Sequence, residues 1–481
     1  MGITGTANGL TLGIDTFVQT CERAWPADQP AAEVFVRAPG RLDCMGGMAD
    51  FSGALALQLP LECCVYAAAA KREDLNIRIE TLSANGEQGV DEPVVEWPIS
   101  WFYQSDGQVA TAEDFAARFE GAGWGRHVAG VFFALLDSGE LPHFGGGVTL
   151  MLQSDIPATA GLASSAAIQS ATAHALSVLF DAGLGANVLA GACRRANEAI
   201  VGDTPGLVDH LTCLCGEADA LLQIRCQPGD VIGTLTLPSD VTFAAVNAGF
   251  RLPIYAERYA QNRAASLMGR FLIERVLRHS GAIDDPTGGY LANVSPNEYV
   301  RRFRNELPVK LRGREFIAAF GQPEELEVTI DPKLTYKVRS RTEHHIYEND
   351  RTHRLLERLA RVRRTGERDA LIEAGELMYA SHWSYGQRCG MGSIETDVLV
   401  NLIRERGAAK GLFGAKVTAG GCGGSVAVLM AKSSTASEAL ADVCRAYEQS
   451  TGKHATVLQG STPGSLVFGH KTPTSHEGQP S

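Results

Sequence analysis

One short segment, SDIPATAGLASSAA at residues 154–167, lies between two patterns that predict different secondary structures. In residues 147–153, directly before it, Val, Leu and Leu occupy every second position, which is typical of a β-strand. In residues 168–179, directly after it, apolar side chains recur at helical spacing and predict an amphipathic helix. The chain is therefore predicted to pass from strand to helix through a loop of small residues.

The residue types in this loop suit an anion. Gly161 lets the backbone approach a bulky ligand closely, and Ser164 and Ser165 suit the open N-terminus of a helix. Unpaired N–H groups and the positive end of the helix dipole meet there, which favours a bound phosphate. An ordinary capped helix after a tight turn fits the same residues, so the loop alone leaves both interpretations open.

Composition narrows the class of protein. The chain has 481 residues, 45% hydrophobic and 20% charged, which is enough for about two or three domains. A net charge of -12 without a basic stripe argues against a nucleic-acid partner. The 11 cysteines are dispersed, which indicates reduced thiols in a cytoplasmic protein and neither a disulfide framework nor a zinc site. No signal peptide or bilayer-spanning apolar run is found, so we expect a soluble protein without a membrane partner.

The order of patterns along the chain predicts four regions. Residues 1–33 form an N-terminal extension with one helix, and a boundary near residue 240 separates two α+β domains, 34–240 and 241–470, that face each other across a cleft. Residues 471–481 are polar and contain prolines, which is typical of a disordered tail. The second domain is predicted to end as sheet, helix and sheet, with ATVLQG and SLVFG in the last sheet segments.

Two further glycine-rich segments accompany the first. In residues 37–53, RAPGRLDCMGGMADFSG, an arginine follows a Pro-Gly turn and two aspartates bracket a glycine pair. In residues 414–430, GAKVTAGGCGGSVAVLM, four glycines separate two strand-like runs. Plain turns would use glycine in the same way, but such glycines also suit a backbone that closes over a ligand. Neither segment matches a Walker loop or the dinucleotide fingerprint, so a phosphate-binding loop of another type is predicted.

Taken in chain order, the three segments resemble the three signature motifs of the GHMP kinases, the family of galactokinase, homoserine kinase and mevalonate kinase. This resemblance implies a two-domain α+β fold, with an N-terminal domain of the ribosomal protein S5 domain 2 type and a ferredoxin-like C-terminal domain. It also implies ATP and Mg²⁺ as the groups bound with the substrate. The second motif, PxxxGLxSSA, implies that the residues around ATP are Pro157, Gly161, Leu162, Ala163, Ser164, Ser165 and Ala166.

Several other segments resemble the galactokinase-like branch, and in particular the kinase domain of plant-type L-arabinokinases, over about residues 34–470. They are GRLDCMGGMADFSG, GDTPGLVDHLTCLCGEADALL, SLMGRFLI, HHIYEND and SYGQRCGMG. Galactokinases typically carry Gly-Glu-His-Thr-Asp-Tyr where residues 46–51 of this chain are Gly-Gly-Met-Ala-Asp-Phe. The resemblance implies a sugar 1-kinase that phosphorylates the anomeric hydroxyl of L-arabinose or a galactose-like sugar.

The resemblance also implies which residues carry the reaction. Asp209, in PGLVDH, matches the family's catalytic aspartate, and Arg41 matches the arginine that supports it. A nearby cation keeps a carboxylate ionised, as a base must be. A first-turn helix acid and a surface ion pair are the plain structural alternatives for these two residues.

For the sugar, the resemblance assigns Asp50 to the ring hydroxyls and Tyr259 to the wall of the site. Asp43 stands where galactokinases carry asparagine, and it is expected either to contact the sugar or to pair with Arg41. The third motif implies that Gly420 and Gly421 also lie at the substrate. Tyr259 fits an aromatic of the helical core equally well.

One departure from the family concerns the metal. A glutamate usually binds Mg²⁺ five residues before a glycine that corresponds to Gly202, but this chain has Asn197 there and Glu198 next to it. Ser165 is the other implied ligand. Adjacent helical residues point about 100° apart, so Glu198 takes the place only through a local register shift. Otherwise Asn197 supplies a neutral oxygen, or Asp203 serves instead.

Two classes of function follow. The first is an ATP-dependent phosphotransferase acting on a sugar hydroxyl, and the second is a non-catalytic sensor of sugar and ATP on the same fold, motivated by Asn197. Arg41 and Asp209 favour the enzyme, because a pure binder needs no base. Kinases for fucose, heptose, glucuronate, mevalonate or homoserine stay open as alternatives. The expected partners are small molecules, and a monomer is compatible with the sequence.

Overall fold

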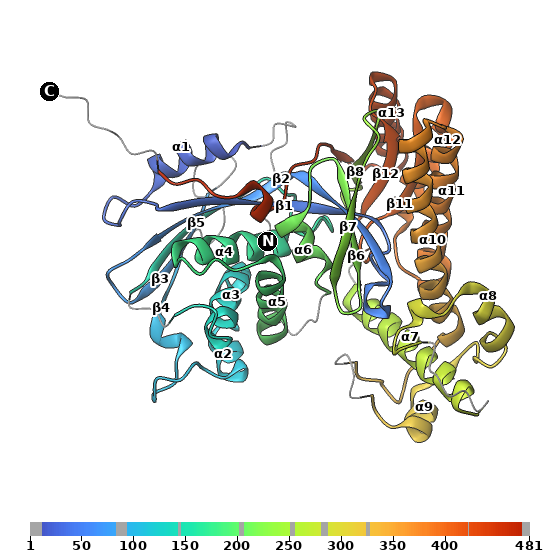
Figure 1. Cartoon of the computed structure of the whole chain (residues 1–481), viewed down its shortest axis with the longest axis horizontal. Coiled ribbons are helices and arrows are strands. Elements are labelled where there is room, and N and C mark those ends of the chain that lie inside the picture. The colour runs from blue at the N-terminus through green and yellow to red at the C-terminus, as the bar shows by residue number, and fades with distance from the viewer. Residues whose placement is uncertain are drawn as a thin grey trace.

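The computed structural model describes residues 12–82, 94–142, 146–201, 206–250, 255–279, 287–323, 328–421 and 423–473. These residues form two lobes, each built around its own sheet (Figure 1). The sheet of the first lobe ends with β7 (Asp230–Thr236), and that of the second begins with β8 (Val241–Asn247). The predicted mixed α and β fold with two domains is confirmed.

The first lobe contains a seven-stranded sheet. Its strand order is β4-β3-β5-β2-β6-β7, and β1 pairs with β2 outside this path. In the described residues, the β3 and β5 pair is parallel and the other pairs are antiparallel. Its first six strands are β1 (Val34–Met45), β2 (Leu55–Lys71), β3 (Asn76–Leu82), β4 (Val94–Pro98), β5 (Val148–Ser154) and β6 (Ala220–Arg225).

Helices cover both faces of this sheet. The predicted N-terminal helix is α1 (Ile14–Ala24), and its Phe17 is fully buried against Phe35 and Tyr66 of the sheet. Burial of such a side chain contributes about 1.5–3 kcal/mol, so this part of the N-terminal extension packs as part of the lobe. The helices that follow are α2 (Ala112–Arg118), α3 (Arg126–Asp137), α4 (Ser164–Leu179), α5 (Ala186–Ala196) and α6 (Val208–Cys215).

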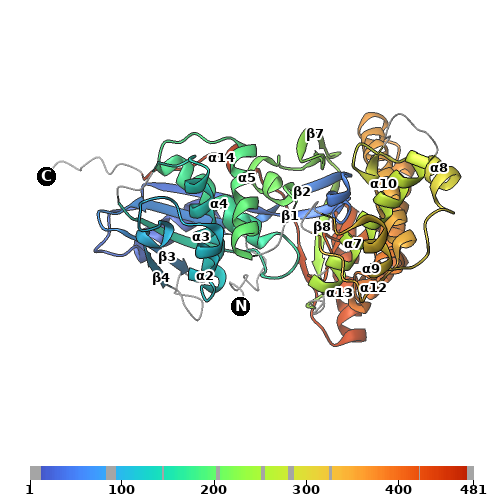
Figure 2. The same cartoon turned by 90° about the horizontal axis from the view of Figure 1, so that it is seen from below.

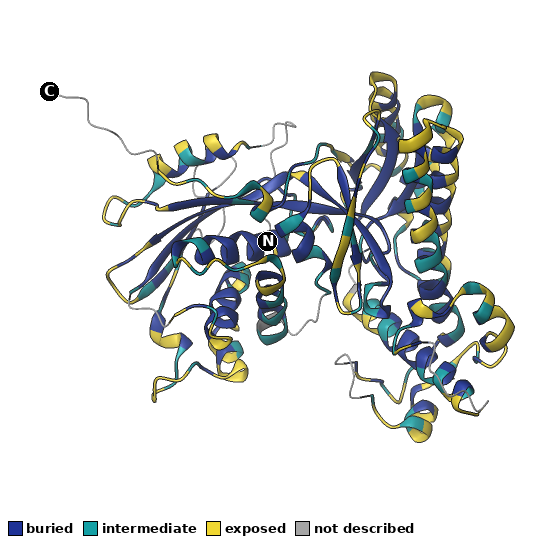
Figure 3. Cartoon of the chain, viewed as in Figure 1, coloured by how far each residue is buried: buried dark blue, intermediate teal, exposed yellow. Residues whose placement is uncertain are grey.

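The strand β5 and helix α4 are those expected on either side of the small-residue loop. Alternation in the sequence predicted a strand with one apolar face, but every residue of β5 is buried. The reason is that both faces are covered: Leu150 and Leu152 belong to the main hydrophobic core, and Met151 belongs to the separate cluster that contains Phe17 of α1. Figure 3 shows the central strands of both sheets as buried, whereas β7, at one edge of the first sheet, is largely exposed.

The second lobe contains a four-stranded antiparallel sheet in the order β11-β12-β8-β13. Long helices pack against this sheet, with their exposed sides turned outward (Figure 3). The elements of this sheet and its main helices are α10 (Val338–Thr365), α11 (Asp369–Ser384), α12 (Ile394–Arg406), β11 (Leu412–Val417), β12 (Ser425–Ala431), α13 (Ser434–Thr451) and β13 (Thr456–Leu458).

A second hydrophobic cluster lies beside this sheet, between α7 and the segment that precedes α10. Its largest fully buried side chains include Tyr299 and Phe303. The helices and strands of this region are α7 (Tyr255–His279), α8 (Pro296–Glu298), β9 (Leu311–Arg312), α9 (Gly313–Phe320) and β10 (Thr335–Tyr336).

The end of the chain returns to the first lobe. The segment SLVFG, predicted as sheet, forms the short helix α14 (Ser465–Phe468), and that prediction is wrong. Contacts explain the difference: Ser465 bonds to buried His174 of α4, and α14 packs against α6 and β1 (Figure 2). Lys471, placed in the disordered tail by the sequence, exchanges two backbone hydrogen bonds with Phe35 of β1. The rest of that predicted tail, residues 474–481, lies outside the described residues.

Two findings bear on the class of protein. Within the described ranges, no helix is both long and apolar enough to cross a membrane. The cysteines of those ranges are free thiols, and all but Cys215 and Cys444 are buried.

Candidate active site

The loop between β5 and α4 turns sharply through three residues with left-handed backbone. They are Thr159, Gly161 and Ala163, with φ of 60°, 76° and 63°. Helix α4 begins directly afterwards, and its N-terminus has no side-chain cap. The first N–H groups of a helix have no partner within the helix, so this terminus can bind a phosphate. Ser164 is half-buried and Ser165 is exposed at this open end.

The loop is held by the second lobe. Gly423, in the glycine loop between β11 and β12, packs directly on it, and a Cβ built on Gly423 would lie 2.1 Å from the Gly161 nitrogen. Ser425 donates a 2.6 Å hydrogen bond to the Ala160 carbonyl, and Asn247 donates to the Gly423 carbonyl at 3.0 Å. The loop of residues 154–167 and the glycine loop of residues 414–430 therefore meet through their backbone atoms.

The predicted catalytic pair is also in contact. Arg41, buried in β1, donates from Nε and Nη2 to the two carboxylate oxygens of Asp209, each at 2.7 Å. Its Nη1 donates to the Gly161 carbonyl at 2.8 Å. A bidentate guanidinium–carboxylate pair is among the stronger charge-assisted interactions. Burial alone would lower the pKa of Arg41, but Asp209 outweighs it and the pKa of Arg41 is raised.

Asp209 lies in the first turn of α6, and its side chain keeps 33% of its exposure. It therefore combines a fixed orientation with access to a ligand. One side chain, Arg41, links this carboxylate to the backbone of the loop that suits phosphate. The arrangement can hold an acceptor hydroxyl at Asp209 while a phosphate chain lies on α4.

Asp43, which was predicted to contact the sugar or to pair with Arg41, bonds to other groups of the protein. Its carboxylate is fully buried and accepts hydrogen bonds from Lys416 at 2.8 Å, Gln58 at 2.9 Å and the Ala419 nitrogen at 3.1 Å. Lys416 is buried as well. No local pattern predicted Lys416 as a partner of Asp43, because Lys416 belongs to the other lobe and lies far away along the chain.

Asp50 opens a short turn between β1 and β2 and is partly buried. Removal from water raises the pKa of its carboxyl to about 7, although the Phe51 nitrogen donates to it at 2.8 Å. The Phe51 ring meets Tyr259 of α7 edge-on, with ring centroids 6.0 Å apart. The structure thus brings Asp50 and Tyr259 to the same region, with Tyr259 half-buried against an aromatic neighbour.

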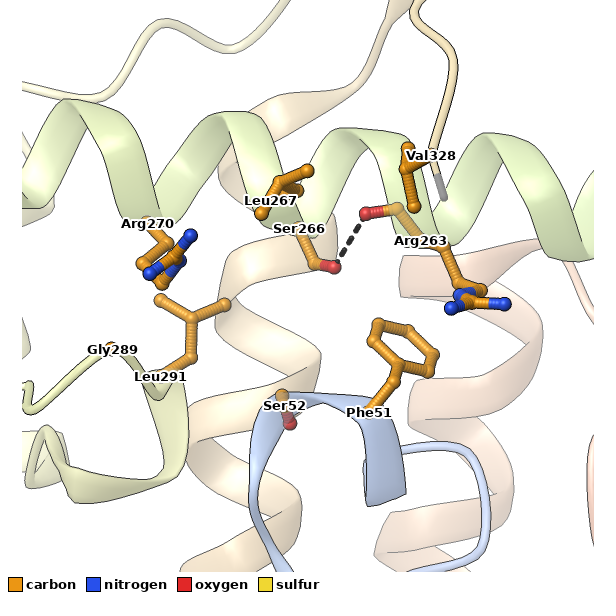
Figure 4. A pocket seen from close by; sticks show the side chains of 9 residues that line it. All are labelled: Phe51, Ser52, Arg263, Ser266, Leu267, Arg270, Gly289, Leu291 and Val328. Atoms are coloured by element: carbon orange, nitrogen blue, oxygen red, sulfur yellow. Dashed lines mark hydrogen bonds between the residues drawn. The ribbon is translucent and has the colours of Figure 1, made fainter. Parts of the chain in front are cut away.

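A hollow of about 320 Å³, open to solvent, adjoins this turn (Figure 4). Phe51 and Arg263 lie at one side of it and Arg270 at the other, and Ser266 between them donates to the Arg263 carbonyl. Its other lining residues are Ser52, Leu267, Gly289, Leu291 and Val328. Asp50 is not among them, so the hollow lies behind Phe51.

Asp50 gives a pH-dependent prediction. Because its pKa is raised to about 7 in the fold from an ordinary 3.8, the folded state binds this proton more tightly than the unfolded chain. Its contribution is favourable at acid pH and is lost as pH rises from about 4 to 7, by at most about 4 kcal/mol at 1.36 kcal/mol per pKa unit. We expect Asp50→Asn to unfold at a higher temperature than the parent at pH 8, with the difference shrinking toward pH 5. Parallel melting curves across this range would contradict it.

The predicted glycines of the third segment lie at the base of its loop. Gly420 and Gly421 are buried, and Gly421 has φ of 77°. The preceding Ala419 is fixed by Tyr385, whose hydroxyl donates to the Ala419 carbonyl and accepts from the Met48 nitrogen. Tyr385, which the sequence patterns did not predict, thereby links the glycine segment of residues 37–53 to that of residues 414–430.

The implied metal ligands are engaged with protein groups. Asn197 is buried, and its amide forms two hydrogen bonds with Gln169 of α4 at 3.0 and 3.2 Å. Buried His210 donates to the same Gln169 oxygen at 2.8 Å. Glu198 forms an ion pair with Arg194 at 2.7 Å.

The residues from 197 to 201 form a π-helical turn, which is a local register shift of the kind considered for Glu198. Asp203 lies outside the described residues. Within those residues no group of three or more His, Cys, Asp or Glu side chains could hold a metal ion. The donor set therefore does not fit a metal site built by protein carboxylates, and Ser165 is the exposed oxygen donor among the predicted ligands.

Comparison with known proteins agrees with this geometry. The model of the GHMP kinases N terminal domain matches residues 126–217, and that of the GHMP kinases C terminal domain matches residues 367–449. An L-arabinokinase of Arabidopsis thaliana is 30% identical over 91% of this chain, which spans 46% of that protein. A galactokinase of Chloroflexus aurantiacus is 27% identical, with 82% of this chain and 83% of that protein covered.

Solved structures show the same fold. Galactokinase of Lactococcus lactis, solved in complex with galactose, matches with a TM-score of 0.70 at 20% identity, over 95% of this chain and 99% of that one. Mevalonate kinase of Methanococcus jannaschii matches with a TM-score of 0.56 at 14% identity, over 91% of this chain and all of that one.

Proposed function

We propose that this chain, which matches the models of the GHMP kinases N terminal and C terminal domains, is an ATP-dependent sugar 1-kinase, which phosphorylates the anomeric hydroxyl of a monosaccharide. The observation that carries the proposal is the contact of Arg41 with both Asp209 and the Gly161 carbonyl. It joins a candidate base to a candidate phosphate loop. A site that only bound sugar and nucleotide would not need the base.

In the reaction, Asp209 orients the acceptor hydroxyl and accepts its proton. The sugar oxygen forms a bond to the γ-phosphorus of ATP, the bond from that phosphorus to the bridging oxygen breaks, and ADP leaves. Phosphoryl transfer depends mainly on positioning and on stabilisation of charge. The open end of α4 stabilises the phosphates, and the two hydrogen bonds from Arg41 hold the Asp209 carboxylate in one orientation.

The substrate we favour is L-arabinose, with a galactose-like hexose next. Where galactokinases typically carry Glu and His, this chain has Gly47 and Met48. Met48 is fully buried, and a Cβ on Gly47 would lie 2.5 Å from the Asp43 carboxyl carbon, so no larger side chain fits there. The turn that carries Asp50 thus lacks the two polar side chains that galactokinases typically have there. A turn with fewer hydrogen-bonding groups suits a sugar with fewer hydroxyls.

A coupled assay of ADP release over L-arabinose, D-galactose, L-fucose, D-glucuronate and heptoses tests the function. Phosphorus NMR of the product identifies the position of the new phosphate. We expect turnover with a neutral sugar. We also expect the phosphorus signal of the product to show coupling to the anomeric proton. The sensor alternative, motivated by Asn197, predicts calorimetric binding of ATP and sugar without ADP release for any of them.

We also propose that Mg²⁺ enters bound to the nucleotide, with Ser165 as the protein donor, because Asn197 and Glu198 are paired elsewhere. Mg²⁺ often keeps few protein ligands. The cytoplasmic location inferred from the dispersed cysteines stays a prediction.

The metal requirement can be tested at Asn197. Asn197→Glu is expected to leave the Mg²⁺ concentration for half-maximal rate within about twofold of the parent, because residue 197 is buried and paired with Gln169. A severalfold fall would show that residue 197 faces the metal, because a carboxylate binds a hard dication more strongly than an amide oxygen. If Glu198 acts through the π-helical turn instead, Asn197→Glu changes little and Glu198→Gln raises the requirement. Titration of Mg²⁺ against rate for both variants separates these outcomes, and no change in either would show that other groups hold the metal.

A further inference from the structure

We propose that Lys416 is a positioning residue, which holds Asp43 so that the guanidinium of Arg41 stays committed to Asp209. Lys416 lies in β11 of the second lobe, whereas Asp43 and Arg41 lie in β1 of the first. The effect on catalysis rests on the proposed function, but the pairing itself can be tested without it.

Lys416 and Asp43 form a charge pair sealed from solvent. The Lys416 ammonium lies 2.8 Å from one Asp43 oxygen, and the side chains are 0% and 1% exposed. The ammonium also lies 4.9 Å from the centre of the Tyr385 ring. Thr418, directly after β11, donates to the Asp43 backbone carbonyl at 3.0 Å. The segment of Lys416 and Thr418 therefore holds both the backbone and the carboxylate of Asp43. No sugar or nucleotide contact is needed to account for either residue.

Arg41 and Asp43 are two residues apart on a strand, so their side chains leave the same face. Arg41 is opposite Pro60 and Asp43 opposite Gln58 in the pairing of β1 with β2. The charge of Asp43 contributes to the raised pKa of Arg41. Arg41 therefore has two carboxylates within its field, Asp43 and Asp209, and forms its fork with Asp209.

Lys416 explains why Arg41 pairs with Asp209 and not with Asp43. A buried carboxylate without a partner is strongly unfavourable, and Asp43 without Lys416 would need another cation. Arg41 is the cation nearest along its strand, and its movement toward Asp43 would release Asp209. Lys416 satisfies Asp43 from the other lobe and removes this competition.

Asp209 has further titratable neighbours, and these bear on the pH test. Asp50 interacts with it electrostatically from the turn after β1, and His210 and Cys213 lie on its own helix. Burial lowers the pKa of His210 to about 4 and raises that of the Cys213 thiol, so both are neutral near pH 7. Arg41 is thus the cation hydrogen-bonded to Asp209, and its loss should show in the acid limb of the rate profile.

The experiment compares Lys416→Met with the double variant Asp43→Asn/Lys416→Met. The single variant leaves Asp43 in competition for Arg41, and we expect kcat to fall at least tenfold. We also expect the acid limb of log kcat to move to higher pH, because a carboxylate that loses its guanidinium binds a proton more readily. The double variant removes the competitor as well, and we expect kcat within about threefold of the parent and the original limb.

Lys432→Met is the matched control, because it breaks an exposed pair with Asp219 and should leave rate and profile unchanged. A double variant as impaired as the single one would overturn the proposal, as would a fall in kcat without movement of the limb. Should Lys416→Met not fold, the double variant decides alone: recovery supports the proposal and a loss beyond tenfold overturns it.

The pairing has a readout that needs no turnover. The Nε–H of Arg41, assigned by NMR, should shift in Lys416→Met and return in the double variant; an unchanged signal in the single variant would overturn the proposal. If the parent protein phosphorylates no sugar, the proposed function fails while this signal still decides the pairing.

Discussion

Asp209→Asn is expected to lower kcat by about 10²–10⁴, the range that general-base catalysis supplies, while ATP binds as in the parent. Asparagine keeps the shape of the side chain and one oxygen for Arg41, but it cannot accept the proton of the acceptor hydroxyl. The loss should therefore lie in the chemical step. Coupled ADP release gives kcat, and calorimetric titration gives the ATP affinity.

A matched control is Asp219→Asn, which alters an exposed aspartate whose partner is Lys432 at 3.5 Å. It should leave both quantities unchanged. Turnover of Asp209→Asn within a few fold of the parent would remove Asp209 from the mechanism, and a comparable loss of ATP affinity would assign it to binding instead.

Gly423→Ala is expected to weaken ATP binding by at least about a hundredfold, in line with a backbone displacement beyond what a packed site absorbs. The added Cβ would lie 2.1 Å from the Gly161 nitrogen and 2.2 Å from the Ala160 carbonyl carbon. Both neighbours are backbone atoms, so the two glycine loops must separate. Calorimetry with ATP measures the effect, and circular dichroism shows whether the fold is retained.

Gly121→Ala serves as the control, because a Cβ there meets nothing within 4 Å. Unchanged ATP affinity in Gly423→Ala would show that the contact of the two loops is not part of the nucleotide site.

The spacing of apolar residues predicted those helices and strands whose structure depends on local sequence. The loop before α4, the strand β5 and the helix α1 all follow from local patterns, because amphipathic spacing records which face is buried. The strand prediction for SLVFG failed because one serine and three apolar residues between glycines are compatible with a strand or a helical turn. Its outcome depends on contacts of α14 with α6 and β1, which no local pattern records.

The candidate site likewise contains residues that the sequence predicted and contacts that it did not predict. Arg41 and Asp209 were implied by a family resemblance, and their contact in the structure is consistent with that assignment. The partner of Asp43, Lys416, was missed because it comes from the other lobe. Gln169 was missed because nothing in a helix of small residues marks it as the partner of Asn197. Polar partners far apart in sequence are set by the packing of whole elements.

The return of the chain end to β1 has a consequence for synthesis. Phe35 is translated more than 400 residues before Lys471, with which it pairs, and the ring of Phe468 stacks under the guanidinium of Arg37. Translation proceeds from the N-terminus, and contacts that span nearly a whole chain form late. The first lobe therefore cannot close while its last strand contacts are still untranslated. A nascent chain stalled after β13 would hold a completed second sheet beside a first lobe that still lacks its contacts with α14 and Lys471.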